Sequence, residues 1–101
     1  MLGFEFRLKT GFFETKTFDL IVSKGKLIFS PVESADQVII IPEKEILNIT
    51  LKNEKSLEIE IQTWDKIYQG LFDSKTDYEK LLKQLTENIN KKIVCEYEGG
   101  N

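Results

Sequence analysis

Few side chains in this sequence are suited to catalytic chemistry. Its 101 residues include no histidine, the commonest general base and metal ligand. Cys95 is the single cysteine, so its thiol would have no imidazole to activate it. Glu58 and Glu60 are spaced to share one face of a strand, but a solvated outer face is the simpler explanation of that pair. We therefore expect a protein that is not an enzyme and that needs no metal or cofactor.

Aromatic and basic residues are better candidates, and the chemistry that they offer is binding. Phe12 and Phe13 adjoin in a predicted loop that Lys9 and Lys16 flank, and Trp64 falls in a later predicted turn. Burying a large apolar side chain is worth roughly 1.5–3 kcal/mol, so exposed aromatic residues indicate a contact surface. The alternative interpretation is that the two Phe fold back to cap the core and that Trp64 packs on its own hairpin.

Composition and charge narrow the class of protein. The apolar share of 41% is sufficient for a globular core. The 14 basic and 17 acidic residues give a net charge of −3, which argues against nucleic-acid binding and against simple electrostatic adhesion to anionic lipid. One cysteine permits no intramolecular disulfide, residues 1–9 do not resemble a secretory signal, and residues 38–41 form too short an apolar run to span a membrane. We expect a cytoplasmic protein.

The elements that must position these residues are mostly strands. Alternation of apolar and polar residues, or β-branched composition, predicts seven short strands at residues 4–9, 18–22, 27–29, 38–41, 46–51, 57–62 and 67–72. We expect the fourth strand to be covered on both faces, and Leu47, Ile49 and Leu51 to share one face of the fifth. Gly70 indicates a bulge, or a place where the helix approaches closely.

One amphipathic helix closes the predicted fold. It runs from about residue 76 to 93, with a capping box of Thr76 and Glu79 and an apolar stripe of Tyr78, Leu81, Leu82, Leu85 and Ile89. The predicted organisation is one domain at residues 1–95 and a flexible tail at 96–101. The predicted fold class is mainly β (α+β), a seven-stranded antiparallel sheet, strongly bent or forming a partly open barrel, capped by the C-terminal helix.

The order and pattern of these segments resemble the pleckstrin-homology-like (PH-like) superfold, and within it the GRAM and bacterial PH-like families. The resemblance covers nearly the whole chain. It rests on Gly-Lys-Leu-Ile-Phe-Ser-Pro at 25–31, Ile41-Pro42 with Ile46 four residues on, residues 57–61, residues 68–72 and the closing helix. It implies that Trp64 lies at the same rim of the barrel as the Phe12–Phe13 loop.

The resemblance also invites a test for phosphoinositide binding. The superfold's lipid-binding members carry a Lys at the end of the first strand and a basic-x-Arg pattern on the second. Lys9 and Lys16 fall roughly at those places, but Phe18 stands where the Arg should be, and Glu14 lies inside the loop. We therefore do not expect specific inositol-phosphate binding.

Three functions remain open at this stage. The first is a non-enzymatic PH-like or GRAM-like module for protein–protein interaction or assembly. It would bind a partner strand at an exposed sheet edge or self-associate, as the resemblance to bacterial relatives implies. The second is a peripheral membrane module that uses Phe12, Phe13 and Trp64 as a wedge beside Lys9 and Lys16. The third is a small-molecule binder at the barrel mouth.

Overall fold

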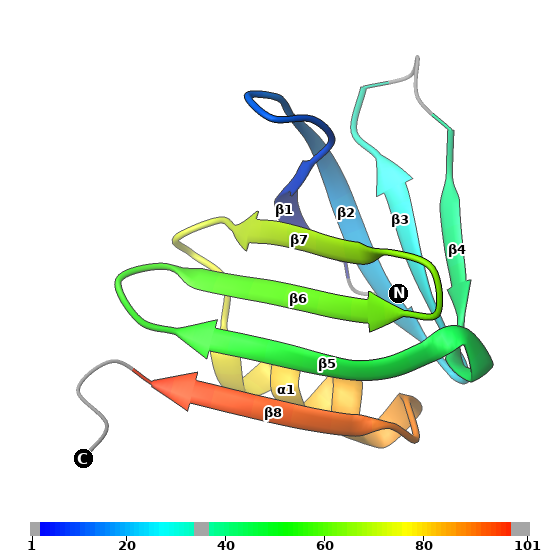
Figure 1. The fold of residues 1–101 in the computed structure, drawn as a ribbon. Coiled ribbons are helices and arrows are strands. Elements are labelled where there is room, and N and C mark those ends of the chain that lie inside the picture. Colours follow the sequence, from blue (N-terminus) through cyan, green and yellow to red (C-terminus); the bar gives the residue numbers. More distant parts are fainter. Residues whose placement is uncertain (1–2, 34–36, 98–101) are drawn as a thin grey trace.

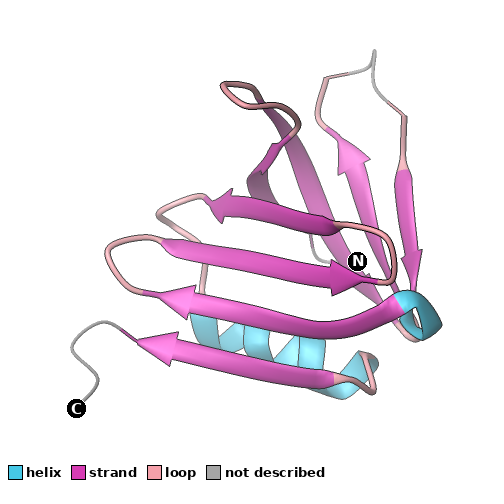
Figure 2. Ribbon diagram, viewed as in Figure 1, coloured by secondary structure: helices cyan, strands magenta, loops and turns pink. Residues whose placement is uncertain are grey.

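The computed structural model describes residues 3–33 and 37–97, which form one eight-stranded sheet and one α-helix (Figures 1 and 2). The elements in chain order are β1 (Gly3–Lys9), β2 (Thr15–Ser23), β3 (Lys26–Pro31), β4 (Ile39–Pro42), η1 (Glu43–Glu45), β5 (Ile46–Asn53), β6 (Leu57–Thr63), β7 (Ile67–Phe72), α1 (Tyr78–Asn88) and β8 (Lys92–Tyr97). The spatial order is β4-β3-β2-β1-β7-β6-β5-β8, and only β5 and β8 pair in parallel. The predicted class, mainly β with a bent, open sheet and a helix after the strands, is confirmed.

The sheet bends where β1 meets β7. These strands pair over only three positions, Phe6–Phe72, Arg7–Leu71 and Leu8–Gly70, and Figure 1 shows the two halves of the sheet diverging beyond them. Gly70 does mark a close approach, but to β1 rather than to the helix: a Cβ atom there would lie 2.3 Å from the ring of Phe6. Because Gly70 has no side chain, the ring of Phe6 on β1 can lie over β7.

The concave side of the bend holds the core. Each of β1 to β7 contributes buried apolar side chains to it, as do α1 and Ile89 just after it. Phe6 lies at its centre with 1% of its surface exposed, and its ring centroid is 5.1 Å from that of Phe29 and 5.5 Å from that of Phe72. Such tilted and edge-on aromatic contacts stabilise a core beyond simple area burial.

The helix is shorter than predicted and begins at a different cap. Asp77, not Thr76, is the N-cap residue, and its Oδ1 accepts a hydrogen bond from the backbone N–H of Lys80 at 3.1 Å. Leu81 and Leu85 are fully buried, whereas Leu82 is half-buried. Across the described residues, no helix is long and apolar enough to span a membrane.

The C-terminal boundary is the largest correction to the predicted elements. The helix ends at Asn88 rather than near residue 93, because Ile89 already has an extended backbone. Lys92–Tyr97 then forms β8, which pairs with β5 from Asn48–Lys92 to Asn53–Tyr97. The first two residues of the predicted tail, 96 and 97, thus belong to a strand, and residues 98–101 lie outside the described residues.

Two strands differ from the prediction in which side chains they expose. The fourth was expected to be covered on both sides, yet β4 is an edge strand on which Ile40 is 55% exposed. The fifth contains a bulge between Ile46 and Asn48, so that Ile46 is buried and Leu47 is 38% exposed. The extra residue of a bulge moves the side chains before it to the opposite face.

The turn between β2 and β3 holds the end of the helix in place. Gly25 has a φ of 78°, a conformation that favours glycine. Its N–H donates to the carbonyl of Asn88 at 2.9 Å, and its carbonyl accepts from the N–H of Glu43 at 2.9 Å. A carbonyl left unpaired at the helix end is thereby satisfied by a tight turn 63 positions earlier in the chain.

Candidate interaction site

The β1–β2 loop presents the most exposed aromatic residues of the described chain. The loop follows the Lys9–Thr15 pair and is closed by a hydrogen bond from the N–H of Thr10 to the carbonyl of Glu14, at 3.0 Å. Phe12 and Phe13 lie near its tip and are 93% and 92% exposed. The sequence left open whether this pair caps the core, and the structure shows that it does not.

The two rings contact each other. Their centroids are 4.7 Å apart and their planes are inclined by 80°, an edge-to-face pair. Gly11 precedes them, and a Cβ atom there would lie 3.0 Å from the Glu14 carboxylate, which therefore folds against the backbone of its own loop. The loop thus presents one compact apolar knob with the carboxylate beside it.

Lys9 and Lys16 flank the loop, and their side chains lie on opposite faces of the β1–β2 hairpin. Lys16 pairs with Leu8, so its side chain starts from the face that Leu8 buries, whereas Lys9 pairs with Thr15 on the outer face. Both lysines are exposed. This arrangement does not direct two ammonium groups at a single headgroup, although it places one positive charge on each side of the knob.

Trp64 belongs to a different part of the surface from the Phe12–Phe13 knob. It lies in the β6–β7 turn, which the backbone and side chain of Thr63 hold through contacts to Lys66. Its indole Nε1 donates to the carbonyl of Lys44 in η1 at 3.3 Å, and the residue is 74% exposed. Figure 1 shows the β1–β2 loop at the top of the view and the β6–β7 turn beside η1, at the right. The single aromatic rim predicted from the sequence is therefore divided into two separate sites.

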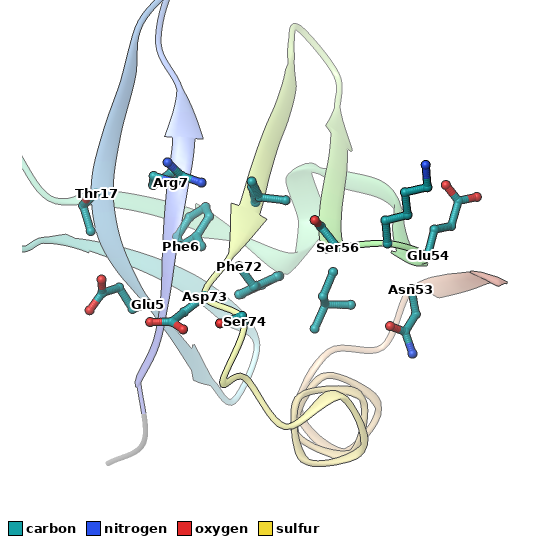
Figure 3. Close-up of a pocket in the computed structure, with 13 residues that line it drawn as sticks. Glu5, Phe6, Arg7, Thr17, Asn53, Glu54, Ser56, Phe72, Asp73 and Ser74 are labelled. Atoms are coloured by element: carbon teal, nitrogen blue, oxygen red, sulfur yellow. The ribbon is translucent and has the colours of Figure 1, made fainter. Parts of the chain in front are cut away.

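A cleft of about 520 Å³ lies away from all of these residues (Figure 3). Glu5, Asp73 and Ser74 border it on one side and Asn53–Leu57, the β5–β6 connection, on the other, with Phe6 and Phe72 between them. Its size suits a small ligand, but ionisable side chains of both signs surround it, and they select no one class of ligand. In residues 3–33 and 37–97, no group of three or more His, Cys, Asp or Glu side chains is arranged to hold a metal ion.

Comparison with known proteins bears on the fold. No protein-family model and no curated protein matches the chain. A chain in a solved structure described as "Structure of the Spt16D Pob3N heterodimer" superposes with a TM-score of 0.68 at 16% sequence identity. The match covers 99% of this chain and 58% of that one, so this protein spans somewhat more than half the neighbour's length. The fold is PH-like.

This PH-like sheet also carries an apolar surface that the sequence reasoning missed. On the outer face of β2, β3 and β4, Ile21 pairs with Ile28, and Ile28 pairs with the exposed Ile40. The sequence shows the alternation of apolar and polar residues within each segment, but it does not show the pairing register of the strands. Only that register places the three isoleucines in one row. The narrower GRAM or bacterial PH-like assignment is not confirmed by these comparisons and stays a prediction.

Proposed function

We propose that the chain is a non-enzymatic PH-like module that binds a protein partner through the β1–β2 loop. The observation that carries the proposal is the exposure of Phe12 and Phe13, at 93% and 92%, on a loop that is closed by its own backbone. Covering each ring would gain roughly 1.5–3 kcal/mol. Aromatic residues, Phe among them, are enriched at protein interfaces relative to the rest of the surface.

The structural neighbour supports a protein partner in a limited way. That protein is described as one member of a heterodimer, and at 16% identity the description concerns only the neighbour. It indicates that a sheet of this form is compatible with protein–protein contact. The present proposal rests on the exposed Phe pair rather than on that description.

Peripheral membrane binding is the second candidate function, and the two lysines favour it. Lys9 and Lys16 emerge on opposite faces of the hairpin below the Phe knob, which suits a flat anionic surface better than one headgroup. The carboxylate of Glu14 inside the loop and the net charge of −3 oppose it. These two features make a protein partner the better-supported function.

A double substitution, Phe12→Ser with Phe13→Ser, tests both functions. The immobilised chain and its variant would be used to capture proteins from an extract of the source cells. Any captured protein would then be purified and titrated against both forms by calorimetry. Co-sedimentation with vesicles containing phosphatidylserine tests the membrane. The matched control is Val32→Ser with Ile67→Ser, which removes two apolar side chains elsewhere on the surface that are 51% and 54% exposed.

We expect the double Phe variant to lose at least about 90% of partner binding, while the control binds like the original chain. The thermal midpoint of the Phe variant should fall by less than about 4 °C, because nearly fully exposed rings contribute little packing. Vesicle binding that disappears only in the Phe variant would assign the loop to membranes. Unchanged binding to both targets would refute a role for the loop.

A further inference from the structure

Edge strand β4 has an unpaired side that is open to a partner. In the described part of the chain, β4 is hydrogen-bonded to β3 and no strand lies on its other side (Figure 1). The N–H of Glu43 donates to the carbonyl of Gly25 at 2.9 Å, one residue beyond the Lys26–Pro42 pair. Residues of an antiparallel strand direct their backbone groups to alternate sides, so Ile41 faces β3 and Ile40 faces the open edge.

The same alternation places Pro42 and Val38 at the open edge. Pro42 has no N–H, but that missing donor would have pointed away from β3, so the ladder to β3 loses nothing. The backbone groups that face the open edge are therefore the N–H and carbonyl of Val38, the N–H and carbonyl of Ile40, and the carbonyl of Pro42. They form a short template for an added strand.

The side chains at this edge are apolar and continue onto the sheet. Ile40 is 55% exposed and begins the outer row that runs through Ile28 to Ile21, both of which are half-buried. Val38 is exposed next to it. A strand added beside β4 would therefore extend an existing apolar row rather than create an isolated contact.

The opposite edge of the sheet lacks these properties. Across Lys92 to Glu96 of β8, where exposure is described, the two exposed residues are Lys92 and Glu96. Charged side chains on an edge strand discourage pairing with another chain. Val38 to Pro42 contains no charged residue. Of the two edges, β4 is the one whose chemistry favours addition of a strand.

Charge along this edge favours a second copy of the chain. The β2–β3 turn and η1 adjoin the Pro42 end of β4, and together they carry three Lys and two Glu, with Lys26 paired to Pro42 itself. Glu33 lies beyond β3 at the other end and carries −1. Antiparallel pairing of two identical edges places the positive end of each copy beside the negative end of the other.

We infer that two copies of this chain associate through β4, paired antiparallel about a twofold axis at Ile40, to form one continuous sheet. In this register the N–H of each Ile40 donates to the carbonyl of the Ile40 in the other copy, and the N–H of each Val38 donates to the opposite Pro42 carbonyl. The missing N–H of Pro42 is thus accommodated. The isoleucine rows of both copies join across the axis. This surface is separate from the Phe12–Phe13 loop, so the inference goes beyond the proposed function.

Sedimentation velocity of the 101-residue chain, from about 10 µM to about 500 µM, tests the inference in a range where small interfaces associate. The decisive variant is Ile40→Lys, which would place two ammonium groups at the twofold axis. The matched control is Ile67→Lys, because Ile67 is 54% exposed on inner strand β7. A second variant, Ile40→Pro, removes the edge-facing N–H together with the isoleucine side chain, but no N–H that faces β3. Circular dichroism would verify the fold of each protein.

We expect the original chain and Ile67→Lys to shift toward twice the mass of one chain as concentration rises. Ile40→Lys should weaken the association at least about 100-fold, Ile40→Pro should also weaken it, and both should stay folded. The Phe12→Ser, Phe13→Ser variant should associate like the original chain, which separates this inference from the proposed function. A chain that stays monomeric at about 500 µM overturns the inference. So does an Ile40→Lys protein that associates unchanged.

Discussion

Gly70 is the position where a single methyl group should reveal how tightly the two halves of the sheet are joined. Its φ is not positive, so alanine could adopt the same backbone conformation without strain. The added Cβ would lie 2.3 Å and 2.7 Å from two ring carbons of Phe6 and 3.2 Å from the carbonyl oxygen of Arg7. Real Cβ contacts are not that short, so the Phe6 ring has to move.

The ring of Phe6 has little room for that movement. It is 1% exposed, and the rings of Phe18, Phe29 and Phe72 surround it with centroid distances of 6.5, 5.1 and 5.5 Å. Overpacking of such a core costs about 1–3 kcal/mol. For a domain of this size each kcal/mol lowers the thermal midpoint by roughly 4–8 °C. We therefore expect Gly70→Ala to lower the midpoint by about 10 °C, although alanine is otherwise favoured over glycine in a strand.

Thermal and urea denaturation of a set of variants would measure the effect. Gly11→Ala is the matched control, because the atom its Cβ approaches is the end of the flexible Glu14 side chain, at 3.0 Å. The double variant Gly70→Ala, Phe6→Leu supplies a direct test of cause. A smaller side chain at residue 6 makes room for the methyl group, so the double variant should be more stable than the sum of the single effects implies. Additive effects, or a neutral Gly70→Ala, would refute the explanation from ring contact.

Two predictions concern the helix. Leu85→Ala should lower the free energy of unfolding by about 2–5 kcal/mol, because Leu85 is fully buried. Lys83→Ala on the exposed side of the helix should be nearly neutral. Equal losses of the two variants in urea denaturation would contradict the buried stripe. Asp77→Ala should lower the free energy of unfolding by about 1 kcal/mol, because it removes the acceptor of the Lys80 N–H, and Asp77→Asn should retain most of that stability. Thr76→Ala should lower the free energy of unfolding by less. The reverse order of losses would show that Thr76 is the N-cap.

The central strands were predictable because burial of one face imposes a period of two. Phe4, Phe6 and Leu8 alternate with charged residues, and the structure buries all three. The same rule failed around Leu47, since a bulge there reverses which residues face the core. A bulge depends on how two strands meet, and the sequence of one strand does not specify it.

The end of the helix was misassigned for a related reason. Residues 89–93 continue an apolar pattern that suits a helix, yet residues 92–97 also alternate well enough for a strand. What selects the strand is the unpaired edge of β5, whose backbone groups β8 satisfies over six paired positions. Local propensity could not decide between the two, because the deciding partner lies more than 40 residues earlier in the chain.

The candidate site, too, could be predicted only in part from the sequence. The sequence identified Phe12, Phe13 and Trp64 as unusual, because aromatic residues in turns have no assured burial. Only the tertiary structure showed that the two Phe contact each other in full exposure while Trp64 docks on η1. It likewise showed that Lys9 and Lys16 leave opposite faces, a fact that follows from the pairing register.

The sequence by itself determined the class of fold, the run of β-strands closed by one helix, and the lack of a histidine or a second cysteine for chemistry. These properties depend on composition and on periods of two and 3.6 residues, which are local. The tertiary structure alone decided the register, the bulge, the eighth strand and the open β4 edge with its row of isoleucines. Each of these depends on which distant backbone is available to pair, and strand pairing is set by the whole chain at once.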